Sequence, residues 1–130
     1  MPRYLADTTI LIESFRKNEK AKQFLLTYTP HISDITTAEL LQGARDKREE
    51  TLILKTCAGL SAISLTTTIS QKAIKLIMQY HLSHGLLILD ALIAATAIEN
   101  KLTLVTENVR DFRFIGELQL MSQKEVFARF

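Results

Sequence analysis

The chain has 130 residues, of which 47% are hydrophobic and 23% are charged, so it can bury a sizeable core and is not intrinsically disordered in its main state. We expect one domain spanning residues 1–130. Sixteen basic and 14 acidic residues give a formal net charge of +2, which lacks the strong basic excess of many obligate nucleic-acid binders. No apolar run is long enough to span a bilayer and no secretory signal begins the chain, so we expect a cytoplasmic protein with no membrane partner.

The first part of the chain alternates short strands with helices. Residues 3–6 form a strand candidate, and Asp7 with the two following threonines can cap a helix over residues 10–15. A second helix is expected over residues 19–28, where Pro30 blocks its continuation, and residues 31–33 follow as a strand. Asp7 therefore stands at a junction between a strand and a helix.

The middle of the chain continues this alternation. A helix is expected to begin at Thr36, and a charged helix from Asp46 to Gly59 is expected to bury Leu52, Ile53 and Leu54. Residues 62–65 form a strand by their β-branched content.

The last part contains the longest helices. Apolar spacings of three and four predict a helix over residues 68–84 with Gly85 as its C-cap, and residues 88–100 form a helix that is apolar nearly all round. Residues 102–106 form a strand, residues 107–112 a loop or short helix, and residues 118–120 a final edge strand. Alternating strands and helices predict an α/β fold with a mostly parallel central sheet flanked by helices.

Four acidic residues stand near predicted strand ends or helix starts. Asp90 lies in an apolar segment with no neutralising neighbour in the chain, and it is either the cap of a buried helix or a ligand. Asp7 is open to the same two interpretations. Glu39 fits a capping box that begins at Thr36, and Asp111 fits the cap of a short turn.

Taken together, these four acids favour a metal site. The carboxyl ends of parallel strands share one edge of the sheet, so Asp7 and Asp111 should meet there, with Glu39 and Asp90 in the first turns of helices beside them. Carboxylates held close together repel one another unless a cation neutralises them. Oxygen ligands without clustered His or Cys suit Mg²⁺ or Mn²⁺.

The chain resembles the PIN-domain ribonucleases of the VapC toxin family from about residue 3 to about residue 121. The resemblance rests on four segments in order: Leu5-Ala6-Asp7-Thr8-Thr9-Ile10-Leu11-Ile12, Thr37-Ala38-Glu39-Leu40, Asp90-Ala91-Leu92-Ile93-Ala94-Ala95-Thr96-Ala97 and Leu104-Val105-Thr106-Glu107-Asn108-Val109-Arg110-Asp111-Phe112. It implies a PIN-like fold, a Mg²⁺- or Mn²⁺-dependent endoribonuclease that cleaves RNA, a homodimer, and inhibition by a cognate antitoxin protein.

The resemblance also implies which residues form the site. Asp7, Glu39 and Asp90 fall on the three most regular acidic positions of the family. Relatives carry the fourth acid either where this chain has Asn108 or where it has Asp111, so we assign Asp111 as the acid and Asn108 as a supporting group.

In the expected mechanism, Asp7 and Asp90 hold the metal ion and Glu39 binds or orients the attacking water. Thr8 and Thr106 can support the carboxylates through hydrogen bonds, although each is also an ordinary cap or strand-end residue. Two alternatives differ in class: a catalytically silent PIN-like binding module, and a phosphoacceptor signalling domain, for which the chain lacks an adjacent acidic pair at the end of a predicted strand.

Overall fold

The computed structural model describes residues 3–130 and contains one five-stranded parallel sheet in the order β3-β2-β1-β4-β5. The strands are β1 (Tyr4–Ala6), β2 (His31–Ser33), β3 (Ser61–Ile63), β4 (Thr103–Thr106) and β5 (Gln119–Ser122). The helices are α1 (Thr8–Phe15), α2 (Glu19–Tyr28), α3 (Asp34–Gln42), α4 (Lys47–Ala58), α5 (Thr67–His84), α6 (Ile88–Glu99) and α7 (Gln123–Phe127), with a 3₁₀ turn η1 at Val109–Asp111. The predicted α/β class and mostly parallel sheet are confirmed.

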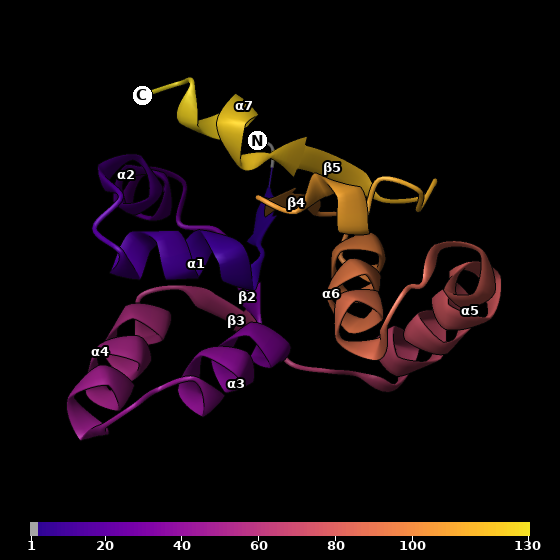
Figure 1. The fold of residues 1–130 in the computed structure, drawn as a ribbon, viewed down its shortest axis with the longest axis horizontal. Coiled ribbons are helices and arrows are strands. Elements are labelled where there is room, and N and C mark those ends of the chain that lie inside the picture. Colours follow the sequence, from indigo (N-terminus) through magenta and orange to yellow (C-terminus); the bar gives the residue numbers. More distant parts are fainter. Residues whose placement is uncertain (1–2) are drawn as a thin grey trace.

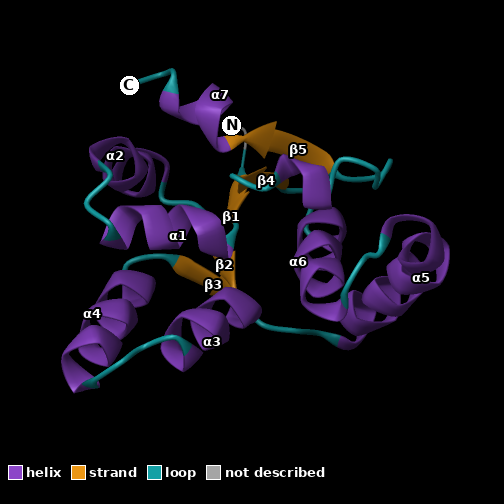
Figure 2. Ribbon diagram, in the orientation of Figure 1, coloured by secondary structure: helices purple, strands orange, loops and turns teal. Residues whose placement is uncertain are grey.

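Helices cover both faces of the sheet, with α5 and α6 on one side and α1, α2 and α4 on the other (Figures 1 and 2). Side chains of a strand alternate between faces, and the two central strands follow this rule. Tyr4, Ala6 and Val105 pack into the core beside α1 and α2, whereas Leu5 and Leu104 pack into the core beside α5 and α6. The centre of the sheet is therefore buried on both sides.

Several helix boundaries agree with their local signals. The helix and strand expected over residues 19–28 and 31–33 have those bounds in the structure. Gly85 ends α5 in the left-handed conformation, at φ 73°, which favours glycine.

Other expectations were wrong. The helix expected from Thr36 begins at Asp34, because Ser33 at the end of β2 caps it by accepting a hydrogen bond from the amide of Ile35. Leu52 and Leu54 are about half exposed, since α4 turns Ile53 and Cys57 toward the core instead. The C-terminal helix α7, with its capping box of Ser122 and Glu125, was not predicted.

The helix α6 is less completely interior than its composition indicates. Its residues from Ile93 to Ala97 are buried, but Ile88 and Leu89 in its first turn are exposed. No helix within residues 3–130 combines the length and the apolar character needed to cross a membrane.

Candidate active site

Asp7 stands at the centre of the site, between β1 and α1. Its amide donates to the carbonyl of Val105 at 2.9 Å, which continues the pairing of β1 with β4. Its side chain is 5% exposed and occupies the N-cap position of α1, but it makes no capping hydrogen bond. Asp7 therefore has the position of a helix cap, but capping does not explain what its carboxylate binds.

Two threonine hydroxyls hold that carboxylate. Thr106, at the end of β4, donates to Oδ2 of Asp7 at 2.8 Å, and Thr9 donates to the same oxygen at 3.0 Å. Burial raises the pKa of Asp7, while these hydroxyls and the nearby amides at the start of α1 act in the opposite direction. Thr106 was predicted as a supporting residue; Thr9 was missed, and its signal is a hydroxyl two residues after an Asp.

Asp90 lies in the first turn of α6, as predicted, and is partly buried. Burial raises its pKa to about 6, and repulsion from Asp7, Asp111 and Glu39 adds to this shift in that order. The negative charges of three acids from three other segments thus act on Asp90.

Glu39 projects from the second turn of α3 and not from the first turn that we expected. The hydroxyl of Thr8 donates to its Oε1 at 2.8 Å and lies 3.0 Å from the hydroxyl of Thr36. Because α3 is capped by Ser33, the capping-box interpretation of Glu39 is wrong. Its carboxylate is oriented by a side chain from α1 instead.

The remaining two predicted residues lie in the turn η1 and directly before it. Asp111 ends the turn and is exposed, and its charge acts on Asp90. Asn108 precedes the turn, and its amide donates to the hydroxyl of Thr106 at 2.9 Å. Asn108 therefore supports the site through its backbone, whereas Asp111 contributes charge.

The donor set fits a hard divalent cation, since carboxylate oxygens are what Mg²⁺ and Mn²⁺ prefer. Within residues 3–130, no group of three or more His, Cys, Asp or Glu side chains is close enough to enclose a metal ion as a cage. This is compatible with Mg²⁺, which is usually held by one or two carboxylates together with water and substrate phosphate. The arrangement is an open acidic site in which Asp90 is repelled by neighbouring carboxylates.

The sequence profile of the PIN domain matches residues 4–118. The chain belongs to the PIN domain family. All four acids of the site lie within the matched range, and the resemblance seen in the sequence is confirmed at this level. A PIN domain is not a phosphoacceptor signalling domain, so that alternative is set aside.

Several solved structures of toxin–antitoxin proteins contain chains that are similar in fold to this PIN domain. A chain of a toxin–antitoxin complex from Klebsiella pneumoniae is 31% identical, with a TM-score of 0.75 over 88% of this chain and 94% of that chain. A chain of VapBC2 from Rickettsia felis, bound to a promoter DNA fragment, is 26% identical, with a TM-score of 0.79 over 92% and 97%. A chain of DNA-bound VapBC from Salmonella typhimurium has a TM-score of 0.83 at 22% identity, over 94% and 98%, and shows the fold alone. No curated protein sequence gives a significant match.

A groove of about 450 Å³ adjoins the acidic site of the PIN domain. Thr8 and Glu39 line it together with apolar residues of α1, α3 and α4, namely Ile12, Phe15, Leu40, Leu52 and Ile53. The exposed Leu52 of α4 thus faces a groove. A ligand in this groove would contact both apolar side chains and a carboxylate of the site.

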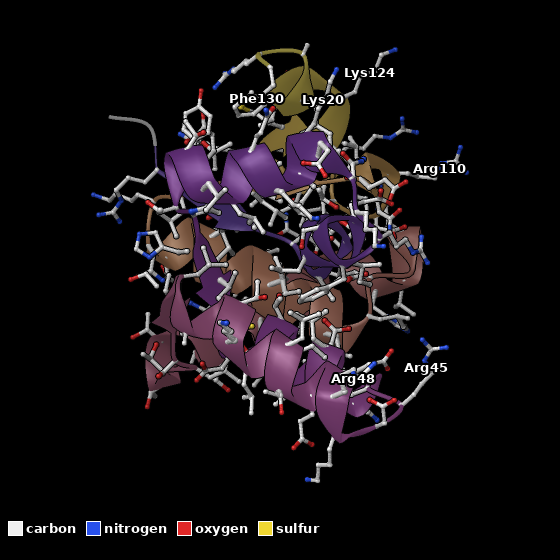
Figure 3. All side chains as sticks on the ribbon, turned by 90° about the vertical axis from the view of Figure 1, so that its left-hand side faces the viewer. Lys20, Arg45, Arg48, Arg110, Lys124 and Phe130 are labelled. Atoms are coloured by element: carbon white, nitrogen blue, oxygen red, sulfur yellow. The ribbon has the colours of Figure 1, made fainter. Side chains whose placement is uncertain are left out.

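Two basic residues in and just before α4 are already paired with acids of that helix. Arg45 and Lys47 are engaged by Glu49 and Glu50, with N–O distances of 2.8 Å and 3.0 Å, so they form surface ion pairs. Figure 3 shows Arg45 extending outward on the lower side of the molecule, well away from Arg110 in the upper half. Arg110 belongs to η1, beside Asp111, and is the basic residue nearest in the chain to the site.

Proposed function

We propose that this PIN domain is a metal-dependent endoribonuclease that acts as the toxin of a toxin–antitoxin pair in the cytoplasm. The observation that carries the proposal is the buried carboxylate of Asp7, which two threonine hydroxyls hold in place and whose negative charge, with those of Asp111 and Glu39, acts on Asp90. Such a cluster lowers the stability of a folded protein, because like charges repel. Groups of this kind are therefore found mainly at functional sites. Binding a divalent cation is the purpose that its oxygen donors fit best.

Asp7 and Asp90 would hold a Mg²⁺ or Mn²⁺ ion. When bound, that ion supplies positive charge at the scissile phosphate and lowers the pKa of a coordinated water. Asp7 is suited to this task because hydroxyls fix one of its oxygens. Asp90 is suited because its charge is otherwise poorly compensated.

The other predicted residues position water and substrate. Glu39 has one oxygen fixed by Thr8, so the other oxygen is free to accept a proton from the attacking water or to orient it. Asp111 adds negative charge at the exposed rim, and Asn108 keeps Thr106 in place. Arg110 beside them can attract the RNA backbone.

The test is cleavage of RNA by the purified protein with Mg²⁺, and again after EDTA. We expect cleavage only with the metal, and we expect Asp7→Asn to lose activity by at least about 100-fold because it removes a charged ligand. Cleavage that persists in EDTA would contradict the metal-dependent mechanism. A folded wild-type protein that cleaves no RNA and binds no metal would favour the silent binding module.

A cognate antitoxin is the proposed protein partner. The groove beside Glu39 can accept the apolar side chains of a partner segment, and an arginine of that segment can pair with the acidic site in bidentate geometry. The Klebsiella pneumoniae relative, at 31% identity, is part of a toxin–antitoxin complex. This likeness supports a partner that blocks the site until the toxin is released.

A homodimer is the proposed assembly. Ile74, Met78 and Leu82 recur every four residues along α5 and are 55%, 78% and 97% exposed, so they form one apolar stripe on its surface. Leu87 and Ile88 extend the apolar surface to the start of α6. A second copy of the chain can cover such a patch by two-fold symmetry.

A further inference from the structure

Thr9 is tied to a part of the chain that lies far from it in sequence. Its hydroxyl oxygen accepts a hydrogen bond from the amide of Glu107 at 3.2 Å and donates to Oδ2 of Asp7 at 3.0 Å. Thr106 repeats this arrangement, because its hydroxyl accepts from the amide of Asn108 at 2.9 Å and donates to the same Oδ2 at 2.8 Å. Two successive backbone amides thus reach one carboxylate oxygen through two hydroxyls.

This arrangement fixes the direction of every hydrogen bond in it. A threonine hydroxyl has a single proton, and an amide N–H can only donate. With Glu107 and Asn108 donating to the hydroxyl oxygens, both hydroxyl protons point to Asp7. The hydroxyls of Thr9 and Thr106 lie 3.5 Å apart, and neither has a second proton to share with the other.

The two oxygens of Asp7 consequently differ. Oδ2 accepts two hydrogen bonds, while the structure shows no hydrogen bond to Oδ1. Among residues 3–130, Gln123 Oε1 is the one fully buried side-chain nitrogen or oxygen atom that has no hydrogen-bond partner. Oδ1 of Asp7 also has no partner, so it is not fully buried and keeps contact with solvent. Oδ1 is therefore the oxygen that is open to a ligand.

We infer that Thr9 is a positioning residue that, with Thr106, holds Oδ2 of Asp7 and leaves Oδ1 as the oxygen that would bind a cation. An ordinary threonine in the first turn of a helix bonds within its own turn, whereas Thr9 links α1 to the segment after β4, 98 residues away. The segment that carries Asn108 and Asp111 is thereby coupled to the orientation of Asp7. The inference rests on the proposed metal-dependent function.

The test compares Mn²⁺ affinity by calorimetry for wild type, Thr9→Val and Thr9→Ser. We expect Thr9→Val to bind Mn²⁺ about tenfold more weakly, since residues that orient a ligand typically affect affinity by this factor or more. Thr9→Ser keeps the hydroxyl and should bind as the wild type does. Thr103→Val, which removes a half-buried hydroxyl at the opposite end of β4, is the matched control and should not change the affinity.

The outcomes separate the inference from the proposed function. If wild type binds Mn²⁺ and a folded Thr9→Val binds it equally well, the inference is wrong while the nuclease proposal stands. If Thr9→Val does not fold, Thr9→Ala replaces it as the hydroxyl-free variant, with the same expectation. If wild type binds no Mn²⁺ and cleaves no RNA, the proposed function is wrong and the inference with it.

Discussion

Asp90, a proposed metal ligand, lowers the stability of the folded protein when it is ionised. Its pKa in the folded chain is about 6, whereas the ordinary value for Asp is 3.8. The folded state therefore binds more protons than the unfolded state between these pH values, and stability falls as the pH rises through them. Above the folded pKa, ionised Asp90 destabilises the fold.

Replacing this charge should stabilise the protein at neutral pH. We expect Asp90→Asn to raise the free energy of unfolding by about 1 kcal/mol at pH 7.5, a gain limited by solvent screening of a partly buried group. At pH 4 the two proteins should be nearly equal, because Asp90 of the wild type is then protonated. Urea unfolding at both pH values without divalent metal measures this; an equal gain at pH 4 would contradict the electrostatic explanation.

Glu39 is the converse case, because we expect it to be important for activity and not for stability. Because Ser33 caps α3, Glu39→Gln removes no capping interaction, and the amide oxygen of Gln can still accept from Thr8. We expect the melting temperature to stay unchanged and RNA cleavage to fall about 100-fold, the usual contribution of a positioned proton acceptor. A variant that cleaves RNA at the wild-type rate would remove Glu39 from the mechanism.

At the scale of elements, the turn between α5 and α6 depends on one glycine. Gly85 has φ of 73°, and its amide donates to the carbonyl of His81 at 2.7 Å, which closes α5. The chain then enters α6, which carries Asp90 in its first turn. A residue with a Cβ is strained in this left-handed conformation.

Gly85→Ala should therefore lower the free energy of unfolding by about 1 kcal/mol. Gly116→Ala is the matched control. A Cβ meets no atom within 4 Å at either position, but Gly116 does not have a positive φ. Denaturant unfolding of the two variants isolates the backbone effect, and an equal loss in both would show that the left-handed turn is not its cause.

At the scale of the whole molecule, the two apolar surfaces are far enough apart for the two proposed protein partners to bind separately. The stripe on α5 and the leucines near α2 and α4 lie at opposite ends of the long axis, as Figure 1 shows for these helices. Leu26 is 81% exposed and lines a second groove, of about 440 Å³, with Leu25, Leu52 and Leu60. A second copy on α5 would leave both grooves accessible to an antitoxin.

Charge substitutions on the two surfaces should have separate effects. We expect Leu82→Glu to shift the protein from dimer to monomer in sedimentation experiments, because a charge in the centre of an apolar interface is costly to bury. Leu52→Glu, in the groove beside Glu39, should leave the proposed dimer intact and weaken capture by the antitoxin about tenfold or more. Loss of both properties in one variant would indicate that the surfaces are not independent.

The sequence by itself determined the order of most elements and several of their boundaries, and it singled out the four acids that we propose for the site. These features depend on short-range physics: Pro30 stops a helix, Gly85 caps another, and apolar spacing marks the buried face of α5. The alternation of strands and helices was enough to predict a parallel sheet, and a parallel sheet brings its strand ends to one edge. For that reason Asp7 and Thr106 could be placed together before the structure was known.

Only the tertiary structure decided how those residues are connected. Three nearby residues, Ser33, Asp34 and Thr36, can each cap α3, and the end of β2 selects Ser33. The role inferred for Thr9 depends on the amide of Glu107, which no local pattern relates to it. Likewise, the half-exposed Leu52 and Leu54 follow from how α4 packs against the sheet. Hydrogen bonds and burial between distant segments exist only once the chain has folded, because they depend on positions in space and not on spacing in the sequence.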